Sequence, residues 1–196
     1  SHEDYVLSYN GSLVQNVGSG EVLASCLLTG RDARELYQLS KALGVNIHAF
    51  SQTRGLIAPQ NSRYTEVERS HNDLVLTLVD FDTLPDDEPI LKVMMVDEPE
   101  LLGPAMAQLP AELDEPYTVV LSTPYFLEFL HPQGNKGRGV EALARHLQIP
   151  AEAVICVGDA GNDAHMIEYA GLGVAMGNAT PEIKAMADYV TTSNDE

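Results

Sequence analysis

Basic residues are scarce in this sequence. Lys and Arg together number 11, against 29 Asp and Glu, so the formal net charge at pH 7 is -18. This charge argues against non-specific binding to nucleic acid or to anionic membranes, because both would repel the protein. It does not exclude a small anionic ligand, because a local cluster of basic side chains can oppose the overall field.

Long apolar runs and cysteines are also scarce. No run approaches the roughly 20 apolar residues of a membrane helix, and no signal peptide is recognisable. Of the two cysteines, Cys26 and Cys156, Cys156 lies in an apolar run and is expected to be a reduced core residue. We therefore expect a cytoplasmic protein. The histidines show no metal-ligand spacing, so the sequence gives a zinc mechanism no support.

The C-terminal third alternates between helix and strand patterns. Residues 137–148 carry apolar side chains at helical spacing and lead into a continuous apolar run at 154–157. A second strand pattern covers 172–176. A helix follows, with Thr180 as N-cap and Pro181 at its first position, and then a last short strand. This alternation predicts a doubly wound α/β core with a parallel sheet.

The middle of the chain contains strand patterns without helical crossovers, which predicts antiparallel pairing. Residues 12–28 read as two strands about a Gly-Ser-Gly turn, and a helix follows at 32–44. We expect a large α+β domain at 18–130, inserted into a core formed by 1–17 and 131–196. Further strands are expected within 45–51, 54–59, 90–97, 117–123 and 125–131, with a helix broken at its prolines within 98–113.

Three polar side chains follow the strand at 154–157: Asp159, Asn162 and Asp163. In an open parallel sheet, ligands bind beyond the carboxyl ends of the strands. Oxygen ligands clustered there suit Mg²⁺, which takes one or two protein carboxylates and leaves room for water and phosphate. The alternative interpretation is an Asp- and Asn-rich turn with Asp163 as a helix N-cap.

Lys136 stands in a glycine-rich segment, residues 133–139, at the start of the helix that leads to Asp159. A lysine there opposes the positive end of the helix dipole, unless an anion occupies the site. The flanking glycines allow backbone N–H groups to approach such an anion. The alternative is a solvated lysine in a flexible turn. Together with the carboxylates, Lys136 favours a phosphate monoester bridged by Mg²⁺.

These segments resemble motifs of a known family. The Asn-Lys-Gly of 135–137, the Gly-Asp-Ala-Gly-Asn-Asp of 158–163 and the Gly-Val-Ala-Met-Gly-Asn-Ala of 173–179 are similar to the third and fourth motifs of haloacid-dehalogenase (HAD) type phosphatases. Residues 8–14 and 127–129 are similar to the Cof-type branch, which comprises sugar-phosphate phosphatases with a large cap domain. The resemblance covers nearly the whole chain. It implies a HAD-like Rossmannoid core, incomplete here, with an inserted α+β cap of the C2 type.

The resemblance also implies residue roles. Asp159 would ligate Mg²⁺, and Asp163 would support that metal or orient Lys136. The substrate would be a small phosphorylated metabolite, with no nucleic acid or membrane partner.

Four further roles concern the substrate. Lys136 would neutralise charge on the phosphoryl group, and Asn162 would bind a phosphoryl or substrate oxygen. Asn10 and Gly11 match the family's Asn-Gly turn beside the active site, although a plain hairpin turn explains them equally well.

The family reaction also needs an aspartate nucleophile and an aspartate general acid in a DxDGT motif, preceding the position of Tyr5–Gly11. We expect the chain to begin after this motif and to be inactive alone. Asp80 and Asp82 imitate the motif but lack its glycine. Residues 29–31 imitate the family's Thr-Gly-Arg segment, although Thr29 is more readily explained as a helix cap.

Two alternatives to a phosphatase remain. A non-catalytic module that binds a phosphate ester or a partner fits the missing nucleophile. A mutase of the same superfamily is disfavoured by the large α+β insert, because mutase caps there are typically smaller and helical.

Overall fold

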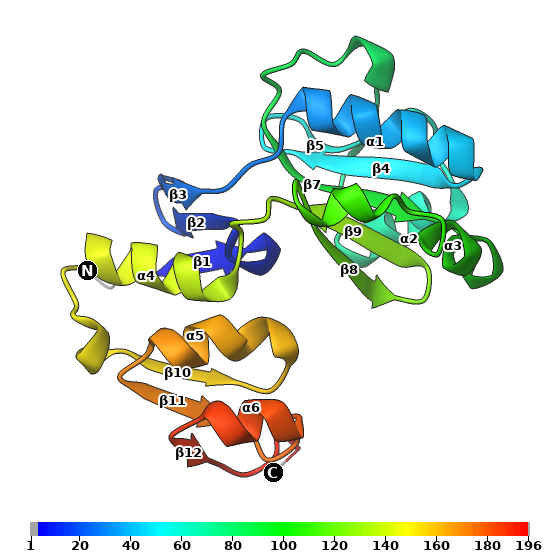
Figure 1. Ribbon diagram of the computed structural model, residues 1–196. Helices are drawn as coiled ribbons and strands as arrows, with labels where there is room; N and C mark the ends of the chain where they lie inside the picture. The colour runs from blue at the N-terminus through cyan, green and yellow to red at the C-terminus, as the bar shows by residue number, and fades with distance from the viewer. Residues whose placement is uncertain (1–3, 196) are drawn as a thin grey trace. The chain divides into compact units, whose positions relative to one another are not determined.

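The computed structural model describes residues 4–195, which form two compact units (Figure 1). The split unit contains the residues up to Cys26 together with those from Gln133 onward, and the insert unit is Leu27–Pro132. The sequence analysis placed the insert at residues 18–130. The insert unit begins later because Val22–Ser25 pairs with Leu13–Asn16 in the split unit. No helix within residues 4–195 has the length and apolar character to cross a membrane.

The insert unit is built on a six-stranded sheet of order β6-β5-β4-β7-β9-β8. Neighbouring strands are antiparallel, as predicted, except for the parallel pair β5 and β6. The helix α2 (Arg63–His71) connects that pair. The sequence analysis missed α2 because only Val67 is aliphatic in it, so no apolar stripe appears. The strands are β4 (Asn46–Ser51), β5 (Gly55–Ala58), β6 (Leu76–Leu78), β7 (Ile90–Val96), β8 (Thr118–Thr123) and β9 (Phe126–Leu130).

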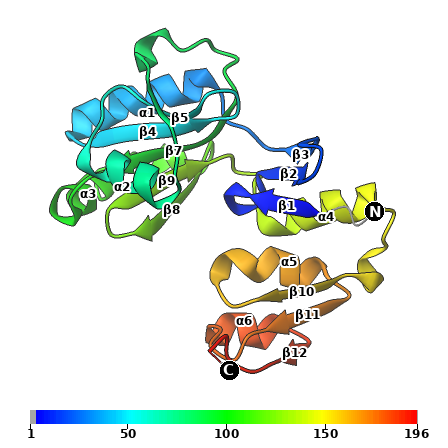
Figure 2. The ribbon, with the colours of Figure 1, turned by 180° about the vertical axis from the view of Figure 1, so that it is seen from behind.

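Helices α1 (Gly30–Leu43) and α3 (Pro99–Met106) cover one face of this sheet (Figure 2). Their apolar side chains, including Leu36 and Leu102, pack with Ile47 and Phe129 in one buried cluster. Because strand residues alternate between faces, His48 points to the other side, where it contacts Thr65 of α2. Two 3-10 helices complete the unit, η2 (Phe81–Thr83) and η3 (Ala111–Asp114).

The helix α1 begins at a capping box. The Thr29 side chain accepts from the Asp32 backbone N–H, and the Asp32 carboxylate accepts from the Thr29 backbone N–H. Both bonds satisfy donors that a helix start leaves free. The interpretation of Thr29 as a helix cap is therefore confirmed.

The split unit contains two three-stranded sheets. The antiparallel sheet is β1 (Tyr5–Ser8), β2 (Leu13–Asn16) and β3 (Val22–Ser25), with the 3-10 helix η1 (Tyr9–Gly11) joining β1 to β2. The strands β10 (Ile155–Gly158), β11 (Leu172–Ala175) and β12 (Tyr189–Val190) pair in parallel, which confirms the predicted α/β alternation. The other helical segments of this unit are α4 (Lys136–His146), η4 (Ala151–Ala153), η5 (Gly161–Asp163), α5 (Ala164–Tyr169) and α6 (Pro181–Met186).

Two helical glycines of the insert unit give a matched test of its packing. A Cβ on Gly30 would lie 1.9 Å from the Pro85 carbonyl oxygen, whereas one on Gly103 would have nothing within 4 Å. We expect Gly30→Ala to lower the free energy of unfolding by about 1–3 kcal/mol through overpacking. Gly103→Ala should change it by less, within about 1 kcal/mol, because the gain in helix propensity is opposed by the restriction that Pro104 places on the residue before it. Urea unfolding measures both, and equal stabilities for the two variants would contradict the close packing of Gly30.

Candidate active site

The candidate site lies at the carboxyl edge of the parallel sheet in the split unit. The strand β10 ends at Gly158 and is followed by Asp159 and η5, and β11 ends at Ala175 and is followed by the loop that contains Asn178. Because the two strands are parallel and adjacent, these loops leave the sheet at the same edge.

Lys136, the first residue of α4, forms an ion pair with Asp163. Its Nζ lies 2.5 Å from Asp163 Oδ1, and the two side chains are 33% and 5% exposed. The aspartate therefore supplies the anion that a cation at a helix N-terminus requires. The lysine is not a freely solvated side chain, so the flexible-turn alternative is wrong.

Two glycines allow this approach. A Cβ on Gly137 would lie 2.6 Å from the backbone of His165, so α4 and α5 meet at a point where only glycine fits. A Cβ on Gly158 would lie 2.5 Å from the Asp163 Cβ. The glycine-rich sequence around Lys136 and Asp159 therefore serves close packing of the site's elements.

The second oxygen of Asp163 closes the turn after β10. Asp163 Oδ2 accepts from the backbone N–H groups of Asp159, at 3.0 Å, and Ala160, at 3.1 Å. The turn interpretation is correct in this respect, but the Asp163 side chain makes no capping bond to α5. Burial alone would raise the pKa of Asp163, but the hydrogen bonds from Lys136 and from the two backbone N–H groups outweigh burial and hold that pKa below its ordinary value.

The Asp159 side chain is hydrogen-bonded through one of its two carboxylate oxygens. Its Oδ2 accepts from Asn178 Nδ2 at 2.8 Å, and its backbone carbonyl accepts from the Thr180 N–H at 3.3 Å. Within residues 4–195, its Oδ1 has no hydrogen-bond or ion-pair partner. The sequence analysis gave Asn178 no role, although it follows the next parallel strand at the same edge, and that position was the available signal.

The Asn10–Gly11 turn reaches the same region. Asn162 Nδ2 donates to Asn10 Oδ1 at 3.2 Å, which joins η5 to the turn between β1 and β2. Gly11 has φ +83°, and a Cβ there would lie 2.3 Å from the Asn135 carbonyl oxygen beside Lys136. The two residues lie in the turn that joins β1 to β2, and this turn packs against the start of α4.

The segments that imitate the DxDGT and Thr-Gly-Arg motifs make structural contacts within the insert unit. Asp80 caps η2 by accepting from the Asp82 N–H, and Asp82 accepts from Gln38 and Lys41 of α1. Arg31 pairs with Glu35 one turn along α1. These contacts give each residue a structural explanation.

The donor set fits Mg²⁺ through a single carboxylate. Among residues 4–195, no three His, Cys, Asp or Glu side chains are grouped as a metal site. Asp159 offers one oxygen without a protein partner, whereas both Asp163 oxygens are already hydrogen-bonded. A protein site of one or two carboxylates, completed by water and phosphate oxygens, is typical of Mg²⁺.

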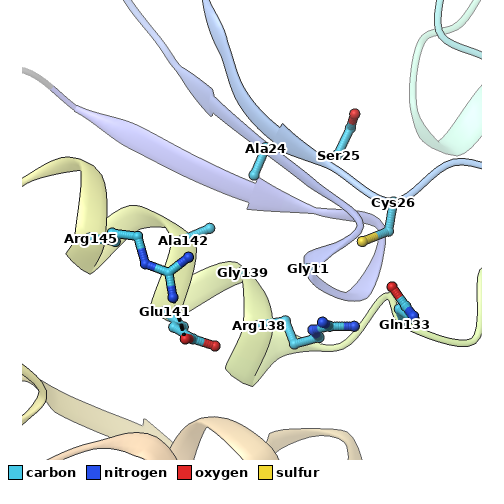
Figure 3. Close-up of a pocket in the computed structure, with 10 residues that line it drawn as sticks. All are labelled: Gly11, Ala24, Ser25, Cys26, Gln133, Arg138, Gly139, Glu141, Ala142 and Arg145. Carbon is cyan, nitrogen blue, oxygen red and sulfur yellow. Dashed lines mark hydrogen bonds and ion pairs between the residues drawn. The ribbon is translucent and has the colours of Figure 1, made fainter.

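A pocket of about 230 Å³ lies beside the Asn10–Gly11 turn, between the β3 end and α4 (Figure 3). Of the six predicted site residues, only Gly11 lines it. Arg145 is paired with Glu141 in this pocket, and Arg138 extends toward Gln133. The pocket is therefore distinct from the Lys136–Asp163 pair.

The ion pair of Lys136 generates a stability prediction. Lys136→Met leaves the buried Asp163 carboxylate with one donor fewer, so we expect the free energy of unfolding at pH 7 to fall by about 1–3 kcal/mol. The stabilisation requires ionised Asp163, whose pKa is lowered by folding. The difference between the proteins should therefore shrink as the pH falls through and below the ordinary aspartate range.

Arg145→Met is the matched control on the same helix. The Arg145–Glu141 pair is 78% and 43% exposed, so its loss should change stability little. Chemical unfolding at several pH values measures both variants. A Lys136→Met protein as stable as Arg145→Met at pH 7 would contradict the buried ion pair.

Comparisons with known proteins agree with this architecture. Residues 1–196 match the family model of haloacid dehalogenase-like hydrolases. "Putative phosphatase YxeH" of Bacillus subtilis is 42% identical over 195 residues, which cover 98% of this chain and 72% of that protein. "Putative phosphatase M6_Spy0533" of Streptococcus pyogenes is 36% identical over 197 residues, with 98% and 72% covered.

The crystal structure of a haloacid dehalogenase-like hydrolase from Bacteroides thetaiotaomicron superposes with a TM-score of 0.83 at 31% identity, over 98% of this chain and 73% of that one. The HAD subclass IIB sugar phosphatase BT4131 has a TM-score of 0.72 at 22% identity, over 98% and 71%, and shows the shared fold alone. The chain therefore belongs to the haloacid dehalogenase-like hydrolases, among the phosphatases of that family.

Proposed function

We propose that this site is the phosphoryl-binding part of a Mg²⁺-dependent sugar-phosphate phosphatase. The observation that carries the proposal is the double use of Asp163. One of its oxygens binds Lys136 Nζ and the other binds the backbone of Asp159 and Ala160. A cation and a candidate metal ligand are thereby fixed to one carboxylate. Catalysis of phosphoryl transfer depends mainly on such positioned charge.

Each residue has a role in this proposal. Lys136 neutralises charge on the phosphoryl group, and Asp163 orients Lys136 and supports the metal site. Asp159 ligates Mg²⁺ through the oxygen that Asn178 leaves free. A bound Mg²⁺ screens negative charge between nucleophile and phosphate.

The turn supplies the remaining contacts. Asn162 binds a phosphoryl or substrate oxygen, and its hydrogen bond to Asn10 fixes its amide. The positive φ of Gly11 keeps this turn tight against the start of α4, so we place Asn10 and Gly11 at the substrate as well.

The nucleophile has no candidate at this site among the described residues. Asp159 and Asp163 have the roles given above, and Asp80 and Asp82 have local contacts in the insert unit. We propose that the nucleophilic aspartate and the general acid come from polypeptide outside these 196 residues, so that this chain alone is inactive.

We assign the split unit to the catalytic core and the insert unit to the cap. Caps of such enzymes exclude water and contact the substrate. The choice of a sugar phosphate, a small cytoplasmic metabolite, is supported by the resemblance to the Cof-type branch. The overall charge of -18 fits a substrate held by local cations better than a polyanionic partner.

A non-catalytic phosphate-ester-binding module is the second candidate. It is favoured by the hydrogen bonding of both Asp163 oxygens, which removes one of the two site carboxylates from covalent chemistry. Both candidates would bind a phosphate ester, but only the phosphatase would hydrolyse it.

The test is hydrolysis of p-nitrophenyl phosphate and a panel of sugar phosphates by the full-length gene product with Mg²⁺. We expect Asp159→Ala and Lys136→Ala each to lower kcat/KM by about 10²-fold or more, because each removes charge stabilisation of the transition state. Chelation of the metal with EDTA should abolish turnover, and a polypeptide of residues 1–196 should show none.

Asp80→Asn is the control, because it preserves an acceptor for the Asp82 N–H while removing the charge. It should keep wild-type turnover. Loss of activity in Asp80→Asn together with full activity in Asp159→Ala would refute the assignment. Phosphate-ester binding without any turnover would establish the non-catalytic module instead.

A further inference from the structure

Asn178 connects the candidate metal ligand to the end of the described chain. Its Nδ2 donates to Asp159 Oδ2 at 2.8 Å, and its Oδ1 accepts from the Asn194 backbone N–H at 3.2 Å. One side chain thus bridges the loop after β10 and the segment after β12. Both ends of the Asn178 amide are used.

The orientation of the Asn178 amide is fixed by chemistry. A backbone N–H only donates, so the amide oxygen must face Asn194. The amide nitrogen must then face Asp159, whose ionised carboxylate only accepts. A flipped amide would break both bonds, so the two contacts enforce each other.

The loop that carries Asn178 is itself held at several points. The Gly177 N–H donates to the Thr192 carbonyl at 2.9 Å, and Lys184 Nζ donates to the Gly177 carbonyl at 2.6 Å. A Cβ on Gly177 would lie 2.7 Å from the Ser193 nitrogen, so the two segments are in close contact. The backbone next to Asn178 is therefore held by several contacts. A side chain can position another only when its own backbone is held in this way.

The contact at Oδ2 orients the Asp159 carboxylate. Asn178 engages Oδ2, so Oδ1 is the Asp159 carboxylate oxygen without a protein partner among residues 4–195 and would be available to a cation. Mg²⁺ demands near-ideal octahedral geometry at short distances, so a carboxylate that rotates freely binds it less well. Groups that orient a ligand in this way commonly change metal affinity by about 10–100-fold when removed.

We propose that Asn178 is a positioning residue: it fixes the Asp159 carboxylate for a divalent cation and is itself held in place by the Asn194 backbone. This inference rests on the proposed function, because it takes Asp159 as the metal ligand. It adds a residue outside the set predicted from the sequence.

The test is Mg²⁺ binding by the full-length gene product, measured by isothermal titration calorimetry without substrate. We expect Asn178→Ala to raise the Mg²⁺ Kd by about 10-fold or more. Asn178→Ser, whose hydroxyl is too short to bridge, should behave similarly. Asn194→Ala is the matched control, because Asn194 contributes only its backbone N–H to Asn178 and should bind Mg²⁺ as the wild type does.

A second readout separates positioning from folding. Thermal midpoints in EDTA should be the same for Asn178→Ser and Asn194→Ala, because Asn178 is exposed. Wild-type Mg²⁺ affinity in both Asn178 variants, with binding lost in Asp159→Ala, would overturn this inference alone. Wild-type affinity in Asp159→Ala would instead overturn the proposed metal ligand.

Discussion

The candidate site depends on the Asp163 carboxylate, whose two oxygens bind different groups. Asp163 binds the ammonium group of Lys136 with one oxygen and the backbone N–H groups of Asp159 and Ala160 with the other. These hydrogen bonds compensate the burial of the charge, since a buried carboxylate without partners would be neutralised or costly. Asp163 thereby joins the start of α4 to the turn after β10. Removing either Lys136 or the two backbone N–H groups would break this connection between the two segments.

Close backbone approach makes that arrangement possible. Gly137 brings α4 against α5, Gly158 admits Asp163 beside β10, and Gly11 brings the β1–β2 turn against Asn135. At each point a Cβ would overlap a neighbouring atom, so even alanine would force the elements apart. The glycines around the site thus position its polar groups, and only at Gly11, with φ +83°, is backbone freedom also needed.

The charge distribution complements this geometry. The protein is strongly acidic overall, yet Lys136 stands where two helices and a strand end converge. Its neighbour Asp163 neutralises it in the described structure, and a phosphate ester would compete for the same ammonium group. Two hydrogen bonds of the Asn178 side chain connect Asp159 to the backbone of Asn194, close to the last described residues. The basic residue that the site contains, Lys136, is held in place by its ion pair with Asp163.

The sequence alone determined the elements with strong local signals. The helix–strand alternation after residue 135 and the Thr180–Pro181 helix start needed only periodicity and capping chemistry, and the candidate site residues were predicted from their motifs. The β2–β3 hairpin was likewise predicted from its Gly-Ser-Gly turn. The polar helix α2 was missed because its sequence has no apolar stripe. The tertiary structure decided which residues meet. Asn10 contacts Asn162, 152 positions away, and Asn178, which the sequence analysis gave no role, contacts Asp159. Such contacts arise from the sheet order and the glycine-lined approaches, which no local pattern encodes.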